Sequence, residues 1–240
     1  MQLDHVVHAV HDREGAAEAL RARGLHVVTG GVHPRWGTHN ALAYFEDLSY
    51  VELIAVREPA VAAVSDFGAP ILRFLEQGEG VATVALRTTA IEADVARLRS
   101  RGIAMGDPQE GSRRLPDGTL LTWRLALAPW PLPFLIEWGA PDETRRADLA
   151  RRGALNAPGR RVETVFWAVH DLAEAARWLV DGYGASLDPA RDEPALAARC
   201  ARSTCGITLC APAGPGPVRE RLDGRGEGPM SYQVTEVGLL

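Results

Sequence analysis

Leu3-Asp-His-Val-Val-His-Ala-Val-His-Asp12 is the stretch of sequence that decides the fold. It reads as a half-apolar strand, and the short helical pattern that follows it stops at Gly24. The same order returns from Val81 to Thr89, and again in a segment that ends in Ala168-Val-His-Asp171, a copy of Ala9-Val-His-Asp12. A repeat of this length sets the whole architecture, so we expect tandem strand–helix–three-strand units.

The repeats predict an α+β fold, with mixed, largely antiparallel sheets and helices on the outer face. In the second unit, Leu115-Pro-Asp-Gly118 is a turn signal, because proline fixes φ and glycine accepts a positive φ. A fourth unit starts and stops after one strand, at residues 231–237. The expected domains are residues 1–140 (two paired units), 141–161 (a polar linker) and 162–240 (the third unit and the truncated fourth).

The composition is that of an ordinary globular protein, with 46% hydrophobic residues, 24% charged residues and a net charge of −5. Its acidity argues against nucleic acid as a partner. All 26 basic residues are arginine, which excludes a Schiff-base lysine. No apolar run is long enough for a membrane span, and the chain opens into a strand with no signal segment. The odd number of cysteines suits a reducing compartment, so we expect a cytoplasmic protein. The three cysteines, at positions 200, 205 and 210, fit buried inert thiols; a metal or redox cluster is the alternative.

Several motifs resemble the vicinal oxygen chelate superfamily, which includes glyoxalase I, extradiol dioxygenases and bleomycin-resistance proteins. The units open with Leu3-Asp-His5 and close with Tyr50-Val-Glu-Leu-Ile54, as they do in that superfamily. Gly31-Val-His-Pro-Arg-Trp-Gly-Thr-His-Asn40 and Leu132-Pro-Phe-Leu-Ile-Glu-Trp138 look more narrowly like glyoxalase-like domain proteins. The resemblance implies sheets that curl around a cavity, with two units forming one site.

The resemblance also implies a divalent metal, held by the first and fourth strands of each unit. Carried over, the four positions are His5, Glu52, Thr83 and Glu137; Thr83 departs from the histidine that relatives usually place there. His5, Glu52 and Glu137 would form a facial triad, suited to Fe, Mn, Zn or Ni. Side chains alternate between the two faces of a strand, which puts His5 and Glu52 on a common face. With Leu135 and Glu137 assigned to the cavity side of the last strand, Glu137 joins them. A pocket without metal is the alternative.

Two further groups are candidates for substrate binding. The Gly/Pro-rich loop carries His33, Trp36, His39 and Asn40, and forms either a rim over the substrate or a purely structural loop. Arg87 and Arg124 are candidates to clamp a carboxylate, whereas Arg113 and Arg114 are expected to be exposed. The predicted substrate-binding residues are therefore Trp36, His33, Asn40, Arg87 and Arg124.

Two functions remain open at this level. The first is a metal-assisted enzyme of isomerase, lyase or dioxygenase type, acting on a small oxygenated organic substrate, with Glu137, Glu52 or His39 moving the proton. The second is a non-catalytic small-molecule binding protein of the bleomycin-resistance type. We also expect a homodimer, since the incomplete fourth unit leaves a sheet face to be covered.

Overall fold

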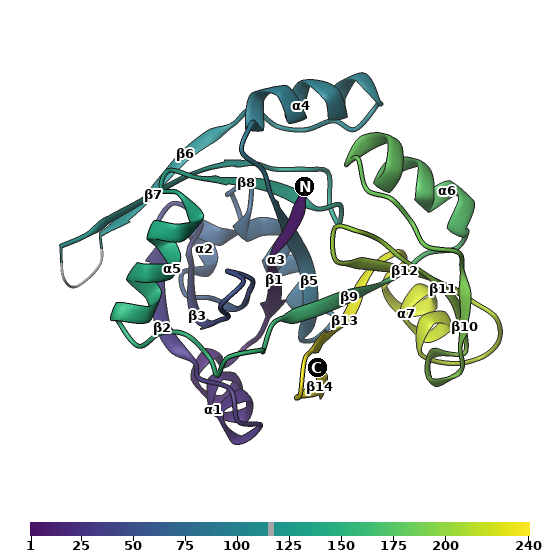
Figure 1. Ribbon diagram of the computed structural model, residues 1–240, viewed down its shortest axis with the longest axis horizontal. Helices are drawn as coiled ribbons and strands as arrows, with labels where there is room; N and C mark the ends of the chain where they lie inside the picture. Colours follow the sequence, from purple (N-terminus) through teal and green to yellow (C-terminus); the bar gives the residue numbers. More distant parts are fainter. Residues whose placement is uncertain (115–117) are drawn as a thin grey trace.

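The computed structural model describes residues 1–114 and 118–240, and it confirms the predicted α+β class (Figure 1). The predicted turn at residues 115–118 lies largely outside the described residues. The first unit has the predicted order. Its elements are β1 (Gln2–Ala9), α1 (Arg13–Ala22), β2 (Val28–His33), β3 (Thr38–Tyr44) and β4 (Tyr50–Val56).

Two short helices then lead into the second unit. The elements are α2 (Pro59–Ala62), α3 (Gly68–Leu75), β5 (Gly80–Arg87), α4 (Ile91–Ser100), β6 (Gln109–Arg114), β7 (Leu120–Ala126) and β8 (Phe134–Trp138). Both units share one sheet with the order β2-β3-β4-β1-β5-β8-β7-β6, in which β1 and β5 pair antiparallel at the centre. The sheet curls, so that its concave face looks inward and α1 and α4 lie outside (Figure 1).

The remaining chain forms a second sheet with the order β10-β11-β12-β9-β13-β14. The segment expected as a linker contains a helix, α5 (Asp142–Arg151). The other elements are β9 (Val162–Ala168), α6 (Leu172–Ala176), a π-helical turn (Arg177–Gly182), β10 (Arg191–Glu193), a 3₁₀ turn (Pro194–Leu196), β11 (Ala198–Arg202), β12 (Ile207–Pro212), α7 (Pro217–Arg225), β13 (Gly228–Val234) and β14 (Gly238–Leu239).

The sequence repeat is also a repeat of hydrogen bonds. The backbone N–H of His11 donates to Glu79 Oε1 at 2.6 Å, and that of His170 donates to Glu227 Oε1 at 2.7 Å. Asp12 and Asp171 cap α1 and α6 in the same way. β13 pairs antiparallel with β9 as β5 pairs with β1, so the first strand of the fourth unit is present and paired within the chain.

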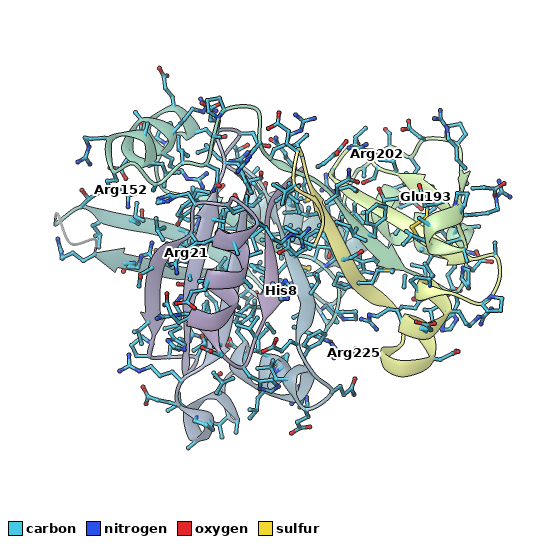
Figure 2. The ribbon with its side chains drawn as sticks, turned by 90° about the horizontal axis from the view of Figure 1, so that it is seen from below. His8, Arg21, Arg152, Glu193, Arg202 and Arg225 are labelled. Carbon is cyan, nitrogen blue, oxygen red and sulfur yellow. A yellow bond between two sulfur atoms is a disulfide. The ribbon has the colours of Figure 1, made fainter. Side chains whose placement is uncertain are left out.

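The C-terminal sheet packs on the outer face of β1 and β5. One hydrophobic core joins the two halves; it includes Leu3, Val6, Val165, Ile207 and Tyr232. The other face of the C-terminal sheet is covered by Val218 and Leu222 of α7. The face that motivated a homodimer is therefore covered within the chain, and the dimer stays a prediction, as does the division into two domains. His8 marks the junction, with Nδ1 3.3 Å from the Tyr232 hydroxyl (Figure 2).

The expectation of inert thiols is wrong for two cysteines. Cys200 and Cys210 form a disulfide, because the hairpin of β11 and β12 places them directly opposite each other. Cys205 is free and buried. Within residues 1–114 and 118–240, no helix has the length and hydropathy that a membrane crossing requires.

Candidate active site

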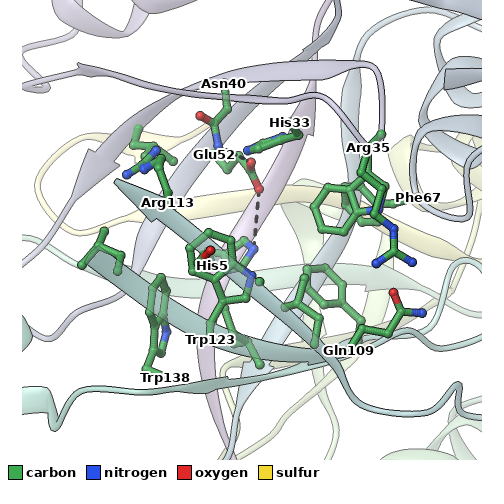
Figure 3. A pocket seen from close by; sticks show the side chains of 18 of the residues that line it. His5, His33, Arg35, Asn40, Glu52, Phe67, Gln109, Arg113, Trp123 and Trp138 are labelled. Atoms are coloured by element: carbon green, nitrogen blue, oxygen red, sulfur yellow. Dashed lines mark hydrogen bonds and ion pairs between the residues drawn. The ribbon is translucent and has the colours of Figure 1, made fainter. Parts of the chain in front are cut away.

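The concave face of the first sheet encloses a pocket of about 270 Å³ (Figure 3). Seven aromatic side chains contribute to its wall, and a smaller set of polar groups faces the same space. The aromatic residues are Trp36, Tyr44, Tyr50, Phe67, Trp123, Phe134 and Trp138, and the polar ones include His5, His33, Asn40, Glu52 and Arg113. A mostly apolar hollow with a few convergent polar groups is the usual form of a small-molecule site.

His5 and Glu52 form the polar centre of the pocket. They come from the neighbouring strands β1 and β4, and His5 Nε2 lies 3.6 Å from Glu52 Oε2. The His5 ring stacks on Tyr50, with ring centroids 4.4 Å apart, and meets the edge of Phe134 at 5.5 Å. Only 4% of His5 and 7% of Glu52 is exposed, so a ligand that reaches them is almost fully out of water.

Asp4 holds His5 in place from behind. A β-bulge between β1 and β5 at this point frees Asp4 from the regular alternation. Asp4 Oδ1 lies 2.8 Å from His5 Nδ1, and Asp4 Oδ2 accepts a hydrogen bond from Trp138 Nε1 at 3.0 Å. A hydrogen bond from Nδ1–H to Asp4 orients Nε2 toward Glu52 and the cavity.

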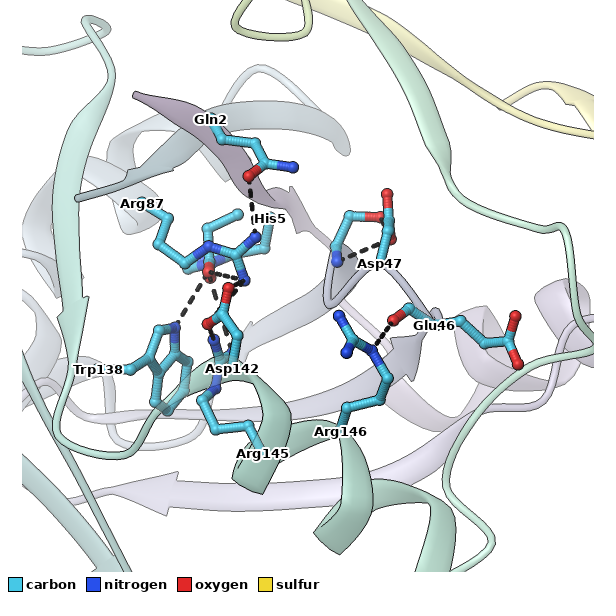
Figure 4. Close-up of polar contacts among 11 residues, drawn as sticks. Gln2, His5, Glu46, Asp47, Arg87, Trp138, Asp142, Arg145 and Arg146 are labelled. Atoms are coloured by element: carbon cyan, nitrogen blue, oxygen red, sulfur yellow. Dashed lines mark hydrogen bonds and ion pairs between the residues drawn. The ribbon is translucent and has the colours of Figure 1, made fainter. Parts of the chain in front are cut away.

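Two arginines neutralise Asp4, which is fully buried. Arg87 Nη1 lies 3.9 Å and Arg145 Nη2 4.0 Å from Asp4 Oδ2, and both guanidiniums also pair with Asp142 (Figure 4). Burial alone would raise the pKa of Asp4. The hydrogen bond with His5, together with the charges of His5, Arg145 and Arg87, outweighs burial and holds the pKa of Asp4 below its usual value.

Asn40 connects Glu52 to the Gly/Pro-rich loop. Its Nδ2 donates to Glu52 Oε1 at 2.5 Å, and its Oδ1 accepts from the backbone N–H of Gly31 at 2.6 Å. Gly30 must be a glycine, because a Cβ there would lie 1.9 Å from Asn40 Oδ1. Oε2 is therefore the carboxylate oxygen of Glu52 that faces His5.

His33 and Trp36 close one side of the pocket. His33 Nδ1 lies 2.9 Å from the Thr38 hydroxyl, and burial lowers the pKa of His33, an effect that Glu52 opposes and Arg113 reinforces. Trp36 Nε1 donates to Asp66 Oδ1 at 2.9 Å, and the indole packs against Phe67. Five predicted site residues thus come together: His5, Glu52, His33, Trp36 and Asn40.

The prediction for Glu137 is wrong. Phe134, Ile136 and Trp138 of β8 line the pocket, so Glu137 lies on the opposite face of the strand. There it pairs with Arg124 and accepts a hydrogen bond from the backbone N–H of Ile91 at 3.4 Å. Glu137 is neither a metal ligand nor a proton-transfer group in this pocket.

The other three predicted residues also lie elsewhere. His39 faces away because its neighbour Asn40 faces inward; Arg13 Nη1 donates to His39 Nδ1 at 3.2 Å. Arg124 bridges Glu92 and Glu137 on the outer face. Arg87 belongs to the buried network around Asp4. His39 is therefore not the acid or base of this pocket, and neither arginine clamps a ligand in it.

Strand register shows how many metal positions survive. β1 and β5 each end shortly before a helix. The backbone N–H of Val10 donates to the carbonyl oxygen of Ile54, and the backbone N–H of Thr88 donates to that of Ile136, so these two pairs are equivalent. Because Val7 pairs with Glu52 and Ala85 pairs with Phe134, the position that corresponds to Glu52 holds Phe134.

The second unit therefore offers no strong metal ligand. Thr83 corresponds to His5, but its hydroxyl lies 3.3 Å from the backbone carbonyl oxygen of Pro131, to which it donates. Among residues 1–114 and 118–240, no group of three or more His, Cys, Asp and Glu side chains is arranged to hold an ion. His5 and Glu52 alone do not fit a resident divalent metal, for which protein sites supply at least three ligands.

Sequence reasoning missed Asp4, Trp123 and Arg113. Asp4 lies next to His5 in the sequence, but only the bulge brings the two side chains together. Arg113 was expected to be exposed, and instead it lines the pocket opposite the loop, where a Cβ on Gly31 would lie 2.8 Å from Arg113 Cδ. The glycine pair Gly30-Gly31 was the signal available in the sequence, because it permits close approach of side chains.

The fold and the site together define a member of the vicinal oxygen chelate superfamily. A family model described as "Glyoxalase-like domain" matches residues 3–183, and the chain belongs to this family. A comparison with curated proteins found no match.

Several solved structures are similar to this chain, and the first of them shares its fold. A hypothetical protein from Staphylococcus aureus has a TM-score of 0.71 and 18% identity, over 88% of this chain and 85% of that one. A Streptomyces coelicolor methylmalonyl-CoA epimerase in complex with 2-nitronate-propionyl-CoA has a TM-score of 0.46 and 25% identity, over 58% of this chain and 99% of that one. The Mycobacterium tuberculosis methylmalonyl-CoA epimerase has a TM-score of 0.43 and 24% identity, over 60% and 91%.

Proposed function

We propose that this protein is an enzyme that transfers a proton on a small oxygenated organic substrate, with Glu52 as the general base. The observation that carries the proposal is the placement of Glu52: a carboxylate inside an aromatic pocket, with Oε1 held by Asn40 and Oε2 3.6 Å from His5 Nε2. A fixed carboxylate shielded from water is suited to take a proton from a carbon next to a carbonyl group.

His5 has the supporting role. Asp4 accepts its Nδ1–H, so Nε2 is free either to accept a hydrogen bond from the substrate or, when protonated, to donate one to a developing oxyanion. Glu52 would return the proton at a neighbouring atom or on the other face, as an isomerase does. No step in this scheme passes through a metal, because the donor set does not fit one.

The alternative is a binding protein without turnover. The observation in its favour is the wall of seven aromatic side chains, which would stack on a planar ligand and bind it without any reaction. Both functions predict ligand binding, and they differ only in whether Glu52 exchanges a proton with the ligand.

Hydrogen–deuterium exchange separates the two. Small 2-oxo acids and aldehydes are incubated with the protein in D₂O, and loss of their C–H signals is followed by NMR. We expect exchange that falls by about 100-fold or more in Glu52→Gln. Glu137→Gln is the matched control and should exchange normally, since Glu137 faces away from the pocket. Binding, seen as quenching of tryptophan fluorescence, without exchange in the wild type would reject the enzyme and leave the binding protein.

A further inference from the structure

Arg113 differs from the other arginines that line the cavities. Arg35 pairs with Asp66 at 3.4 Å, Arg87 pairs with Asp142 at 3.4 Å, and Arg97 pairs with Asp94 at 2.8 Å. Arg113 makes no ion pair with any residue that the structure describes, and its Nε is buried without a hydrogen-bond partner. Burial of such a donor is unfavourable unless something binds to it.

The position of Arg113 directs its charge into the pocket. Its aliphatic stem lies against the backbone of Gly31, on the far edge of the curled sheet, and its charge acts on two pocket residues. After the larger effect of burial, its charge lowers the pKa of His33, and its charge together with a side-chain hydrogen bond opposes the rise in the pKa of Tyr44. In Figure 3, Arg113 and Arg35 lie on opposite sides of the pair formed by Glu52 and His5.

We infer that Arg113 binds the carboxylate of the substrate, and that the substrate is a small aromatic monocarboxylic acid; this rests on the proposed function of the pocket. A guanidinium presents a planar fork that matches a carboxylate in two parallel hydrogen bonds. One uncompensated positive charge balances one negative charge, and a dianion would be repelled by Glu52 nearby. The aromatic walls, among them Trp36 and Trp123, bind the ring.

The bound acid places its reactive carbon at Glu52. With the carboxylate on Arg113 and the ring between the aromatic walls, the carbon between them lies in the part of the pocket that Glu52 and His5 line. Specificity follows from the same arrangement, because an uncharged analogue of the same shape leaves the guanidinium without an anionic partner.

The test uses tryptophan fluorescence, since Trp36, Trp123 and Trp138 line the pocket. The probes are phenylpyruvate and benzoate, their uncharged amides, and phenyl phosphate as a dianion. We expect both carboxylates to bind the wild type, and Arg113→Met to weaken them by about 10- to 100-fold without changing amide binding. Arg113→Lys should recover part of the loss. Arg114→Met is the matched control, because Arg114 is exposed on the same strand and donates to the Gly118 carbonyl.

Three results would overturn the inference: carboxylates and amides that bind equally, phenyl phosphate that binds more tightly than the carboxylates, or no quenching by either acid. Failure of the proposed function looks different. In that case phenylpyruvate binds in an Arg113-dependent way, and its CH₂ protons do not exchange in D₂O. Exchange of a neutral carbonyl compound that depends on Glu52 and not on Arg113 would keep the proposed function and reject only the aromatic acid.

Discussion

Asp4→Asn tests the buried network that positions His5. Asp4 is fully buried and accepts two hydrogen bonds, from His5 and Trp138, at 2.8 and 3.0 Å. It also lies within 4.0 Å of Arg87 and Arg145. The substitution keeps the size of the side chain and removes its charge, so that it isolates the electrostatic role of the carboxylate.

The magnitude follows from what remains in the variant. Breaking a buried ion pair by removing one partner costs about 3–5 kcal/mol. Two features reduce this cost. Asp142 still pairs with both guanidiniums, at 3.4 Å from Arg87 and 3.2 Å from Arg145, and the asparagine oxygen can still accept from Trp138. We expect a loss of about 2–4 kcal/mol in the free energy of unfolding, or a fall of roughly 5–15 °C in Tm.

Urea unfolding at pH 7 measures this loss, and Asp142→Asn is the matched control. The side chain of Asp142 is 51% exposed and contacts the same two arginines, so its substitution should cost less than about 1 kcal/mol. The pKa of Asp4 is lowered in the folded protein, so the stability that Asp4 contributes is present above the unfolded value of about 3.9. The gap between wild type and Asp4→Asn should therefore close as the pH falls through the folded pKa. Equal costs for the two variants at pH 7 would refute the network described above.

Asp4→Asn should also change the tautomer of His5. The asparagine Nδ2 would donate to His5 Nδ1, so that the ring proton moves to Nε2 and points at Glu52. Nitrogen chemical shifts of the His5 ring report the tautomer directly, and a ring that keeps its proton on Nδ1 in the variant would contradict this assignment.

Three further predictions test other parts of the structure. Burial lowers the pKa of His8 to about 4, so between pH 6.5 and 5 the unfolded chain binds a proton at this residue and the folded protein does not. Urea unfolding should show that His8 lowers the free energy of unfolding by up to about 2 kcal/mol from pH 7 to 5, and this contribution should be absent in His8→Gln. Gly31→Ala places a methyl group 2.8 Å from Arg113 Cδ, and should weaken carboxylate binding in the fluorescence titration while leaving the amide unchanged. Reduction of the disulfide between Cys200 and Cys210, which are 10 residues apart, should lower stability by up to about 3 kcal/mol in urea unfolding, and Cys200→Ser should make stability insensitive to reductant.

Local patterns predicted the first half of the site correctly. Alternation along β1 and β4 placed His5 and Glu52 on one face, and both residues line the pocket. The same reasoning failed at β8, where Phe134-Leu-Ile-Glu-Trp138 is apolar on both faces and gives no phase. Hydrogen-bonded pairing with β5 decides which side chains of β8 face the pocket, and the residues of β8 alone do not predict that pairing.

The features that the sequence could not predict depend on contacts between residues that are distant along the chain. Arg113 reaches the pocket only because the two edges of the sheet curl toward each other, which brings β6 to Gly31 of β2. Cys200 meets Cys210 through the register of one hairpin, although counting along a single strand separates the cysteines by face. In both cases the contact depends on geometry that forms after the strands are paired.

The repeats explain why the polar centre lies in the first unit and not in the third. Register places Thr164 and Thr208 of the third unit where His5 and Glu52 stand in the first. The two threonine hydroxyls lie 2.7 Å apart and hydrogen-bond to each other, so they satisfy each other without a ligand. Val218 and Leu222 of α7 pack on the same sheet and contribute to its core. His5 and Glu52, at 3.6 Å, instead face an open cavity, and that difference favours ligand chemistry in the first unit and a structural role for the third.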